Sequence, residues 1–494
     1  MLFNSYVFIF AFLPITLIGF GVLGRFGTRR LGIGWLILCS MVYYGYWNWR
    51  YLLLLVISML VNYLIGTVWL YQPSPKVRKA GLIVGLIFNL SVLGYFKYTN
   101  LFFSTLASLA GGGFQIHKII LPLGISFFTF QKIAYLVDVY KGKTYSRNIL
   151  DYCLFVVFFP QLIAGPIVHP REVLPQFSRR RGFGITSKNL SIGLTIFVIG
   201  LAKKVLIADT LSPSASAAFD GAAAGNVPGL TNAWLGVLCY SMQIYFDFSG
   251  YTDMAIGLAR IFGVRLPVNF NSPYQAASIV DFWRRWHMTL SRFLRDYLYI
   301  PLGGSRKGPA RRYVNLMITM LLGGLWHGAN WTFLAWGGLH GLYLCINHAY
   351  AHFGAKSAAA SAPSRWGLIW KRGLTFLAVV VAWVFFRADS FGTAGRLLGA
   401  MAGSKGLKLA EFRDSHMRWP MVLTAMAFCF FAINTQHFMS LARPALGVVP
   451  PAPDQRGGEV LWQPTAGWAL LTAGVAVACI LFLSRASEFI YYQF

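Results

Sequence analysis

Residues 51–70 read YLLLLVISMLVNYLIGTVWL, twenty consecutive residues without a charged side chain. A helix of about 20 such residues crosses the roughly 30 Å hydrocarbon core of a bilayer. Similar apolar stretches recur along the whole chain, so we expect an all-α, polytopic membrane protein with roughly ten to twelve transmembrane helices. The other stretches are residues 7–23, 80–93, 119–136, 190–207, 233–248, 313–325, 332–346, 374–386, 421–433 and 466–483.

The overall composition supports the same fold class. Of the 494 residues, 56% are hydrophobic and only 12% are charged, whereas soluble domains carry about 25% charged residues. No polar segment is long enough to form a separate soluble domain. We therefore predict a single membrane domain over residues 1–494, with a core at about 80–350 and C-terminal helices at about 370–494.

The formal net charge of +28 indicates how the chain is oriented in the membrane. Lys and Arg concentrate in the cytoplasmic loops of membrane proteins, which explains the excess without a nucleic-acid partner. The loop at 212–229 has no basic residue and is expected outside, and so is the N-terminus, since basic residues follow the first apolar stretch. The basic clusters lie between apolar stretches, at 76–79, 141–147, 179–188, 306–312 and 371–372.

The six cysteines are dispersed in or beside apolar stretches, and no pair of them has metal-ligand spacing. Such residues behave as small buried hydrophobes. We expect neither a disulfide nor a metal site.

Two segments do not fit a simple membrane span. Residues 283–297 carry several charges, each costing roughly 2.5–3.5 kcal/mol at the bilayer centre. On a helix at 100° per residue, their aromatic and Leu side chains share one arc, while Arg284, His287 and Arg295 share the next. This pattern predicts one amphipathic helix at the interface. The apolar run at 161–175, broken by Gly165 and Pro166, predicts re-entrant irregular backbone that lines a cavity.

His327 is the strongest candidate for chemistry. It lies in GGLWHGANW at 323–331, between apolar stretches. An ionisable residue at that depth indicates function, and burial favours the neutral imidazole, which accepts a proton. The nearby glycines would let a backbone or a substrate approach closely. A histidine that only bridges two helices is the alternative.

Several other residues are candidate site residues. His287 is the second histidine, although an interfacial helix also carries His as a solvated residue. Asn330, on the face of His327, is a candidate to orient that ring or to stabilise an oxyanion. Arg284, Arg285 and Arg295 are suited either to bind the phosphates of a thioester donor or to set the topology.

Asp247 and Asp253 lie in YFDFSGYTD at the end of an apolar stretch. Their spacing of six does not place them on one helical face. We expect a structural use, with Asp253 near the start of the next helix.

The motifs DFWRRWH (281–287), LRDYLY (294–299) and GLWHGANW (324–331) together resemble the signature of the membrane-bound O-acyltransferase superfamily. Further matching stretches are LPLGISF (121–127), LIAGP (162–166) and FFRAD (385–389), so the resemblance covers nearly the whole chain. Within the superfamily the likeness is closest to the bacterial members that take part in alginate O-acetylation.

The resemblance implies a many-helix fold around a central tunnel, with His287 and His327 as catalytic histidines and Trp286 and Trp326 in their motifs. It implies that acetyl-coenzyme A or another acyl thioester is the donor and that no cofactor is bound. The acetyl group would cross the bacterial inner membrane to an exopolysaccharide, directly or through a periplasmic SGNH-hydrolase-like partner. Membrane lipids would surround the protein, and the N-terminus would be periplasmic.

Cellulose and peptidoglycan remain open as acceptors in place of alginate, and two alternatives to acetyl transfer also remain open from the sequence. D-alanyl transfer to teichoic acid would use the same histidines with a carrier-bound thioester. A transporter of the polymer or its precursor would share the membrane helices but would turn over no thioester.

Overall fold

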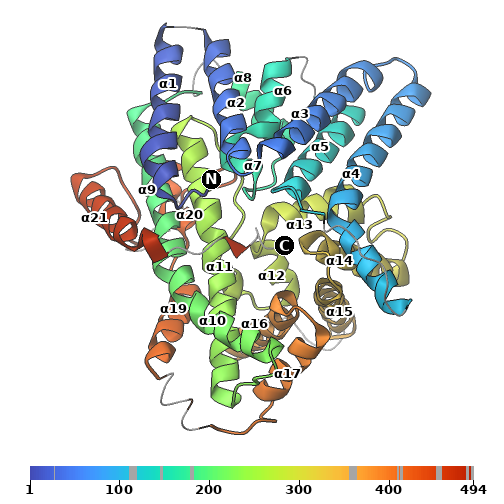
Figure 1. Cartoon of the computed structure of the whole chain (residues 1–494), viewed down its shortest axis with the longest axis vertical. Helices are drawn as coiled ribbons and strands as arrows, with labels where there is room; N and C mark the ends of the chain where they lie inside the picture. The colour runs from blue at the N-terminus through green and yellow to red at the C-terminus, as the bar shows by residue number, and fades with distance from the viewer. Residues whose placement is uncertain are drawn as a thin grey trace. The chain divides into compact units, whose positions relative to one another are not determined.

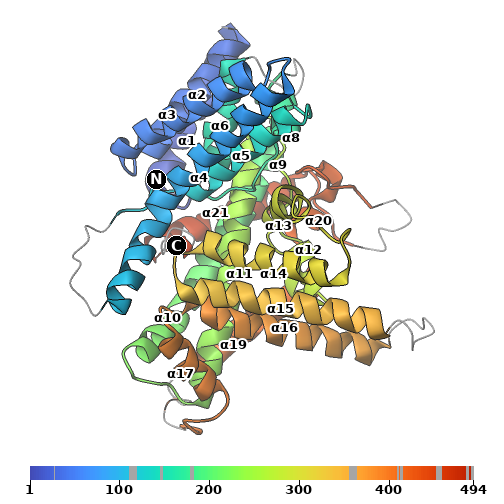
Figure 2. The ribbon, with the colours of Figure 1, turned by 90° about the vertical axis from the view of Figure 1, so that its right-hand side faces the viewer.

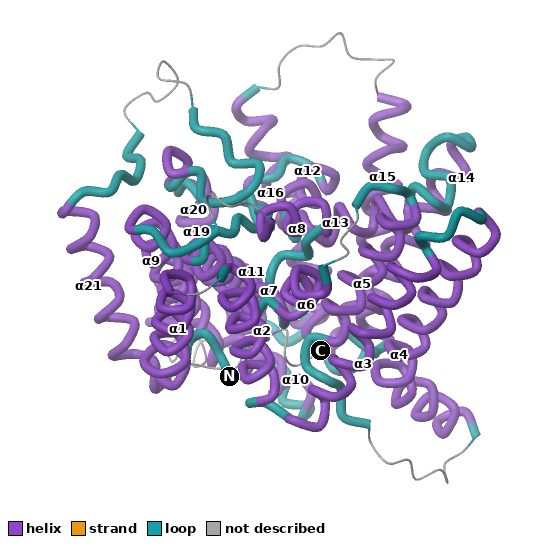
Figure 3. Tube along the Cα trace, turned by 90° about the horizontal axis from the view of Figure 1, so that it is seen from above, coloured by secondary structure: helices purple, strands orange, loops and turns teal. Residues whose placement is uncertain are grey.

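The computed structural model describes residues 1–26, 28–110, 119–144, 148–178, 183–354, 364–408, 411, 416–451, 459–485 and 489–490. These residues form helices and loops and no β-strand (Figures 1 and 3). The predicted all-α fold is therefore confirmed. The basic residues at 145–147 and 179–182 lie outside the described part of the chain.

Five described helices are long and apolar enough to cross a membrane. Some of them contain a π-helical turn, as where α3 (Trp49–Leu64) continues into η2 (Ile65–Trp69). The helix α21 (Ala466–Phe482) is apolar but shorter. The protein is thus a multi-pass membrane protein, while ten to twelve spans remain a prediction. The five are Phe8–Phe26, Trp49–Trp69, Pro75–Leu109, Ser187–Ala223 and Arg365–Arg387.

The chain forms two compact units, and the first comprises Met1–Ala202, Gly250–Val268 and Thr435–Ala486. In this unit α1 (Leu13–Phe26) packs on α2 (Arg29–Gly45), which in turn packs on α6 (Ile149–Val157). Separately, α4 (Pro75–Leu109) packs on α5 (Ile125–Tyr140). Polar pairs link the apolar helices of this unit, as where the buried Asn62 and Asn89 exchange amide hydrogen bonds.

The irregular segment of the first unit lies between α7 (Phe159–Leu162) and α8 (Pro170–Ser178). Its residues 163–169 are not helical, and they are buried. A Cβ on Gly165 would lie 2.4 Å from the Cα of Gln161, so the chain turns back on itself too closely for any other residue. Irregular backbone is confirmed here, whereas a cavity that it lines remains a prediction.

The second unit comprises Lys203–Ser249, Asn269–Asn434 and Ser487–Phe494. Within it α14 (Pro309–His327), α15 (Trp331–Gly354) and α16 (Arg365–Arg387) lie side by side (Figure 2). A Cβ on Gly324 would meet the Phe333 carbonyl oxygen at 2.3 Å. The glycines near His327 therefore admit the backbone of the neighbouring helix.

The single amphipathic helix predicted at 283–297 is wrong. The segment divides into α12 (Ile279–Arg285), α13 (Met288–Leu294) and the π-helical η5 (Arg295–Tyr299). The break falls at Trp286 and His287, and His287 has a left-handed backbone with φ 42°. Because the break turns His287 inward, its side chain leaves the arc of Arg284 and becomes completely buried.

Asp247 and Asp253 both lie inside α11 (Leu230–Ile261). The expectation that a helix begins near Asp253 is therefore wrong. Partners from distant segments satisfy the two carboxylates instead. Thr435 and Gln436 donate to Asp253 at 2.7 and 3.0 Å. The buried helix continues because these hydrogen bonds satisfy the carboxylates without a helix end.

Candidate active site

The two motif histidines lie together in the second unit. The ring centroids of His287 and His327 are 6.2 Å apart, although the residues are forty positions apart in the chain. The exposed fractions of their side chains are 0% and 4%. His287 comes from the junction of α12 and α13, and His327 is the last residue of α14.

Asn269 explains why the chain can break at His287. Its backbone carbonyl accepts from the Met288 N–H at 2.9 Å, and its Oδ1 accepts from the Thr289 N–H at 3.3 Å. The first N–H groups of a helix have no partner inside the helix. Asn269 therefore satisfies the start of α13 and holds His287 at the junction.

The same side-chain oxygen of Asn269 also contacts the imidazole of His287. His287 Nδ1 lies 3.1 Å from Asn269 Oδ1, and the Thr289 hydroxyl donates to that oxygen at 2.8 Å. Asn269 and Thr289 are both buried. Hydrogen bonds at such a dry position restrict the orientation of the imidazole more strongly than they would in water.

His327 is fixed by the turn that ends α14. Gly328 has an extended backbone, and a Cβ at this position would lie 2.1 Å from the Phe333 ring. The α14–α15 turn therefore needs glycine directly after the histidine. Around the imidazole, the ring centroids of Trp336 and Phe386 lie 5.0 and 5.2 Å away.

The two motif tryptophans take different positions. Trp326 lies beside both histidines, with its ring centroid 4.9 Å from that of His327 and 6.0 Å from that of His287. Trp286 is fully buried and packs on Trp383 at 5.0 Å between centroids. Trp326 thus has ring contacts with both histidines.

Asn330 lies beyond the turn, and its amide has partners there. Its Nδ2 donates to the Asp389 carbonyl oxygen at 2.8 Å, and its Oδ1 accepts from the Thr332 N–H at 3.2 Å. The pKa of the Asp389 carboxyl is lowered, chiefly because the Thr393 hydroxyl donates to it. In this arrangement Asn330 caps α15 and ties it to the loop after α16.

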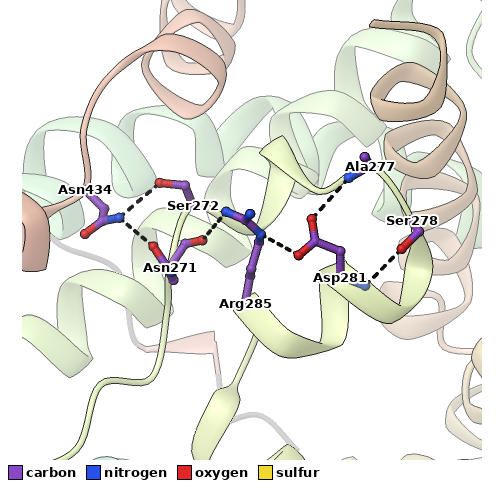
Figure 4. A network of polar contacts seen from close by, with 7 residues as sticks. All are labelled: Asn271, Ser272, Ala277, Ser278, Asp281, Arg285 and Asn434. Atoms are coloured by element: carbon purple, nitrogen blue, oxygen red, sulfur yellow. Dashed lines mark hydrogen bonds and ion pairs between the residues drawn. The ribbon is translucent and has the colours of Figure 1, made fainter. Parts of the chain in front are cut away.

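Arg285 takes part in the polar network shown in Figure 4. Its guanidinium is 2.8 Å from the Asp281 carboxylate and donates to the Asn271 carbonyl oxygen at 3.4 Å. Ser278 accepts from the Asp281 N–H at 3.1 Å, which resembles a capping box at the start of α12. Arg285 is therefore tied to the fold of this segment.

The other two candidate arginines are exposed. Arg284 lies on the exposed face of α12. Arg295 is exposed and pairs with Asp296 at 2.7 Å. Neither makes a described contact with the histidine pair, so a role in binding the donor remains a prediction.

Among the residues that the structure describes, no three His, Cys, Asp or Glu side chains are grouped closely enough to hold a metal ion. The expectation of a metal-free site remains a prediction.

Sequence reasoning missed Asn269, Trp336 and Phe386. They lie outside the histidine motifs, and each contacts a histidine only after the chain has folded. The one local signal was an asparagine in the polar run NFNSPY (269–274) between apolar segments.

Known proteins resemble this chain along its length. The model of the membrane-bound O-acyltransferase family matches residues 41–387. The probable alginate O-acetylase AlgI of Pseudomonas putida is 40% identical over all of both chains. The peptidoglycan O-acetyltransferase of Helicobacter pylori is 44% identical over 83% of this chain and 81% of its own. The teichoic acid D-alanyltransferase of Bacillus subtilis is 28% identical over 56% of this chain and 71% of its own.

Proposed function

Because the chain belongs to the membrane-bound O-acyltransferase family, we propose that it takes an acetyl group from a cytoplasmic acyl thioester and passes it across the inner membrane to O-acetylate a polysaccharide. Its membership makes it an acyltransferase, so the transporter alternative is no longer needed. The choice of acetyl follows from the names of the relatives that are at least 40% identical to it.

The observation that carries the proposal is the buried pair His287 and His327, with 6.2 Å between ring centroids. Burying an imidazole costs free energy unless it is hydrogen-bonded, and the rings of Trp336 and Phe386 lie against that of His327. A neutral imidazole in such a dry site can accept a proton near neutral pH.

In the proposed reaction His327 accepts the proton of the acceptor hydroxyl as its oxygen attacks the thioester carbonyl. A C–O bond forms and the C–S bond breaks. The proton then passes from the imidazole to the leaving thiolate, and the free thiol departs. The negative charge that develops on the carbonyl oxygen requires hydrogen-bond donors, each worth roughly 3–4 kcal/mol in such a site.

Acetyl-coenzyme A is the proposed donor, approaching from the cytoplasmic side where basic residues such as Arg306 and Lys307 are exposed. A polysaccharide of the alginate type is the proposed acceptor, reached directly or through a periplasmic SGNH-hydrolase-like partner. The N-terminus is proposed to be periplasmic, because basic residues follow the first apolar stretch and such residues concentrate on the cytoplasmic side.

D-alanyl transfer remains the second candidate because a teichoic acid D-alanyltransferase is 28% identical over 56% of this chain. It would require a D-alanyl thioester on a carrier protein. The same histidine pair would perform the transfer, so the donor distinguishes the two reactions.

The test uses the full-length protein in lipid nanodiscs with radiolabelled acetyl-coenzyme A. We expect thiol release that depends on an acceptor polysaccharide, and a loss of at least about 100-fold in His327→Ala. Immunoblotting of membranes checks that the variant is inserted in normal amounts.

Retained acetylation in an inserted His327→Ala protein would remove the base assignment. Turnover of a D-alanyl carrier thioester, with none of acetyl-coenzyme A, would favour the second candidate. Parallel reactions with alginate, cellulose and peptidoglycan fragments identify the acceptor.

A further inference from the structure

The side-chain amide of Asn269 lies beside the imidazole of His287. The backbone N–H of Thr289 points at the side-chain oxygen of Asn269, at 3.3 Å. A backbone N–H can only donate, so the Asn269 atom at this position is the oxygen and not the amide nitrogen. The assignment of the amide therefore rests on its surroundings.

An amide oxygen can only accept hydrogen bonds. His287 Nδ1 lies 3.1 Å from this same oxygen, so Nδ1 must carry the hydrogen and donate it. In a neutral imidazole the other nitrogen, Nε2, is then unprotonated and carries a lone pair that can accept a hydrogen bond. The asparagine thus selects one of the two tautomers.

We infer that Asn269 is a positioning residue that holds neutral His287 as the Nδ1–H tautomer, so that Nε2 presents its lone pair as a hydrogen-bond acceptor at the reaction centre, while His327 takes the transferred proton. The inference rests on the proposed acyl transfer. It also assigns a role to His287, because an unprotonated Nε2 cannot donate to the carbonyl oxygen of the thioester. Stabilisation of that oxygen must come from another donor.

The geometry of the segment supports a dedicated role. His287 has φ 42°, a backbone conformation that is uncommon for residues other than glycine. The backbone and the side chain of Asn269 both contribute, because its carbonyl oxygen binds the Met288 N–H at 2.9 Å. Fixing the backbone and the tautomer together aligns Nε2 in one direction.

The test compares two substitutions of Asn269 in full-length protein reconstituted in nanodiscs. Asn269→Leu removes the acceptor, and we expect kcat to fall by about 100-fold while KM for acetyl-coenzyme A changes little. Asn269→Asp keeps an acceptor oxygen for Nδ1–H and for Thr289, so we expect it to recover at least a tenth of the wild-type kcat.

The aspartate variant provides a readout that a purely structural role would not change. Its negative charge beside His287 favours the imidazolium and raises the pKa of that ring. Because catalysis needs the neutral ring, the acidic limb of the pH–rate profile should move to higher pH by about one unit or more. An unchanged limb in an active Asn269→Asp enzyme would overturn the inference.

The matched control is Asn89→Leu, which removes another buried, hydrogen-bonded asparagine in the first unit. We expect less inserted protein but the wild-type pH profile. His287→Ala separates the proposed role of His287 in the reaction from the positioning role of Asn269. Full activity in that variant would reject a role of His287 in the proposed reaction, whereas an inactive His287→Ala with an Asn269→Leu enzyme of normal kcat would reject only the positioning role.

Discussion

The ammonium nitrogen of Lys204 lies 2.7 Å from a carboxylate oxygen of Asp247, and both side chains are almost completely buried. Asp209 pairs with the same nitrogen at 2.8 Å, and the Ile490 N–H donates to Asp247 at 2.9 Å. A lysine inside an apolar helix is thus compensated by two carboxylates, one of which also holds the C-terminal segment.

Replacing this lysine should destabilise the protein. In Lys204→Met two carboxylates remain buried without their cation, which typically costs about 3–5 kcal/mol. We expect less inserted protein and a lower thermal midpoint in detergent, measured by fluorescence-detected gel filtration. The triple variant Lys204→Met, Asp209→Asn, Asp247→Asn leaves no uncompensated charge and should recover part of the loss. A single variant as stable as the wild type would contradict this role.

Helix packing beside the active site should depend on Gly324. In Gly324→Ala the new Cβ would lie 2.3 Å from the Phe333 carbonyl oxygen, so α14 and α15 would have to separate. Such overpacking typically costs about 1–3 kcal/mol, and the shift should also lower kcat because His327 ends α14. The measurement is thermal stability together with acetyl transfer.

Gly338→Ala is the control for Gly324→Ala in the same helix pair. Its Cβ would meet the nearest atom, Leu321 Cδ2, at an ordinary 3.6 Å. We expect wild-type stability. Equal losses in the two variants would mean that close backbone approach is not the cause.

Neighbouring arginines should respond differently to substitution. Arg285 is paired with Asp281 at 2.8 Å, so Arg285→Ala should lower stability by up to about 1 kcal/mol, as partly exposed ion pairs do. Arg284 is exposed, and if it contacts donor phosphates, Arg284→Ala should raise KM for acetyl-coenzyme A severalfold at constant kcat. Thermal unfolding measures the effect of Arg285→Ala. Steady-state kinetics at low and high salt measure that of Arg284→Ala, since salt screens the phosphate contact.

Asn330 should contribute to stability more than to the chemical step. Its amide donates to Asp389 and it accepts from Thr332, so Asn330→Ala should cost about 1 kcal/mol, as lost helix caps do. We expect kcat to fall by less than tenfold. A fall of 100-fold or more, typical of a lost oxyanion donor, would instead support the oxyanion role considered from the sequence.

The amino-acid sequence by itself determined the membrane fold and the two histidines. Long uncharged stretches such as 51–70 favour helices in a bilayer whatever their neighbours are. His327 stands out because ionisable side chains are rare among apolar residues, whereas His287 stands in a charged segment and is indicated by the family motif that contains it. These features are local, so reading along the chain is sufficient to find them.

The tertiary structure decided how these residues are arranged. Helical periodicity could not place a break at His287, because the backbone hydrogen bonds that permit it come from Asn269, eighteen residues earlier. It could not show that Arg285 pairs with Asp281, nor that the glycines beside His327 admit a neighbouring helix. Contacts between distant residues depend on packing, and packing places the two imidazoles 6.2 Å apart.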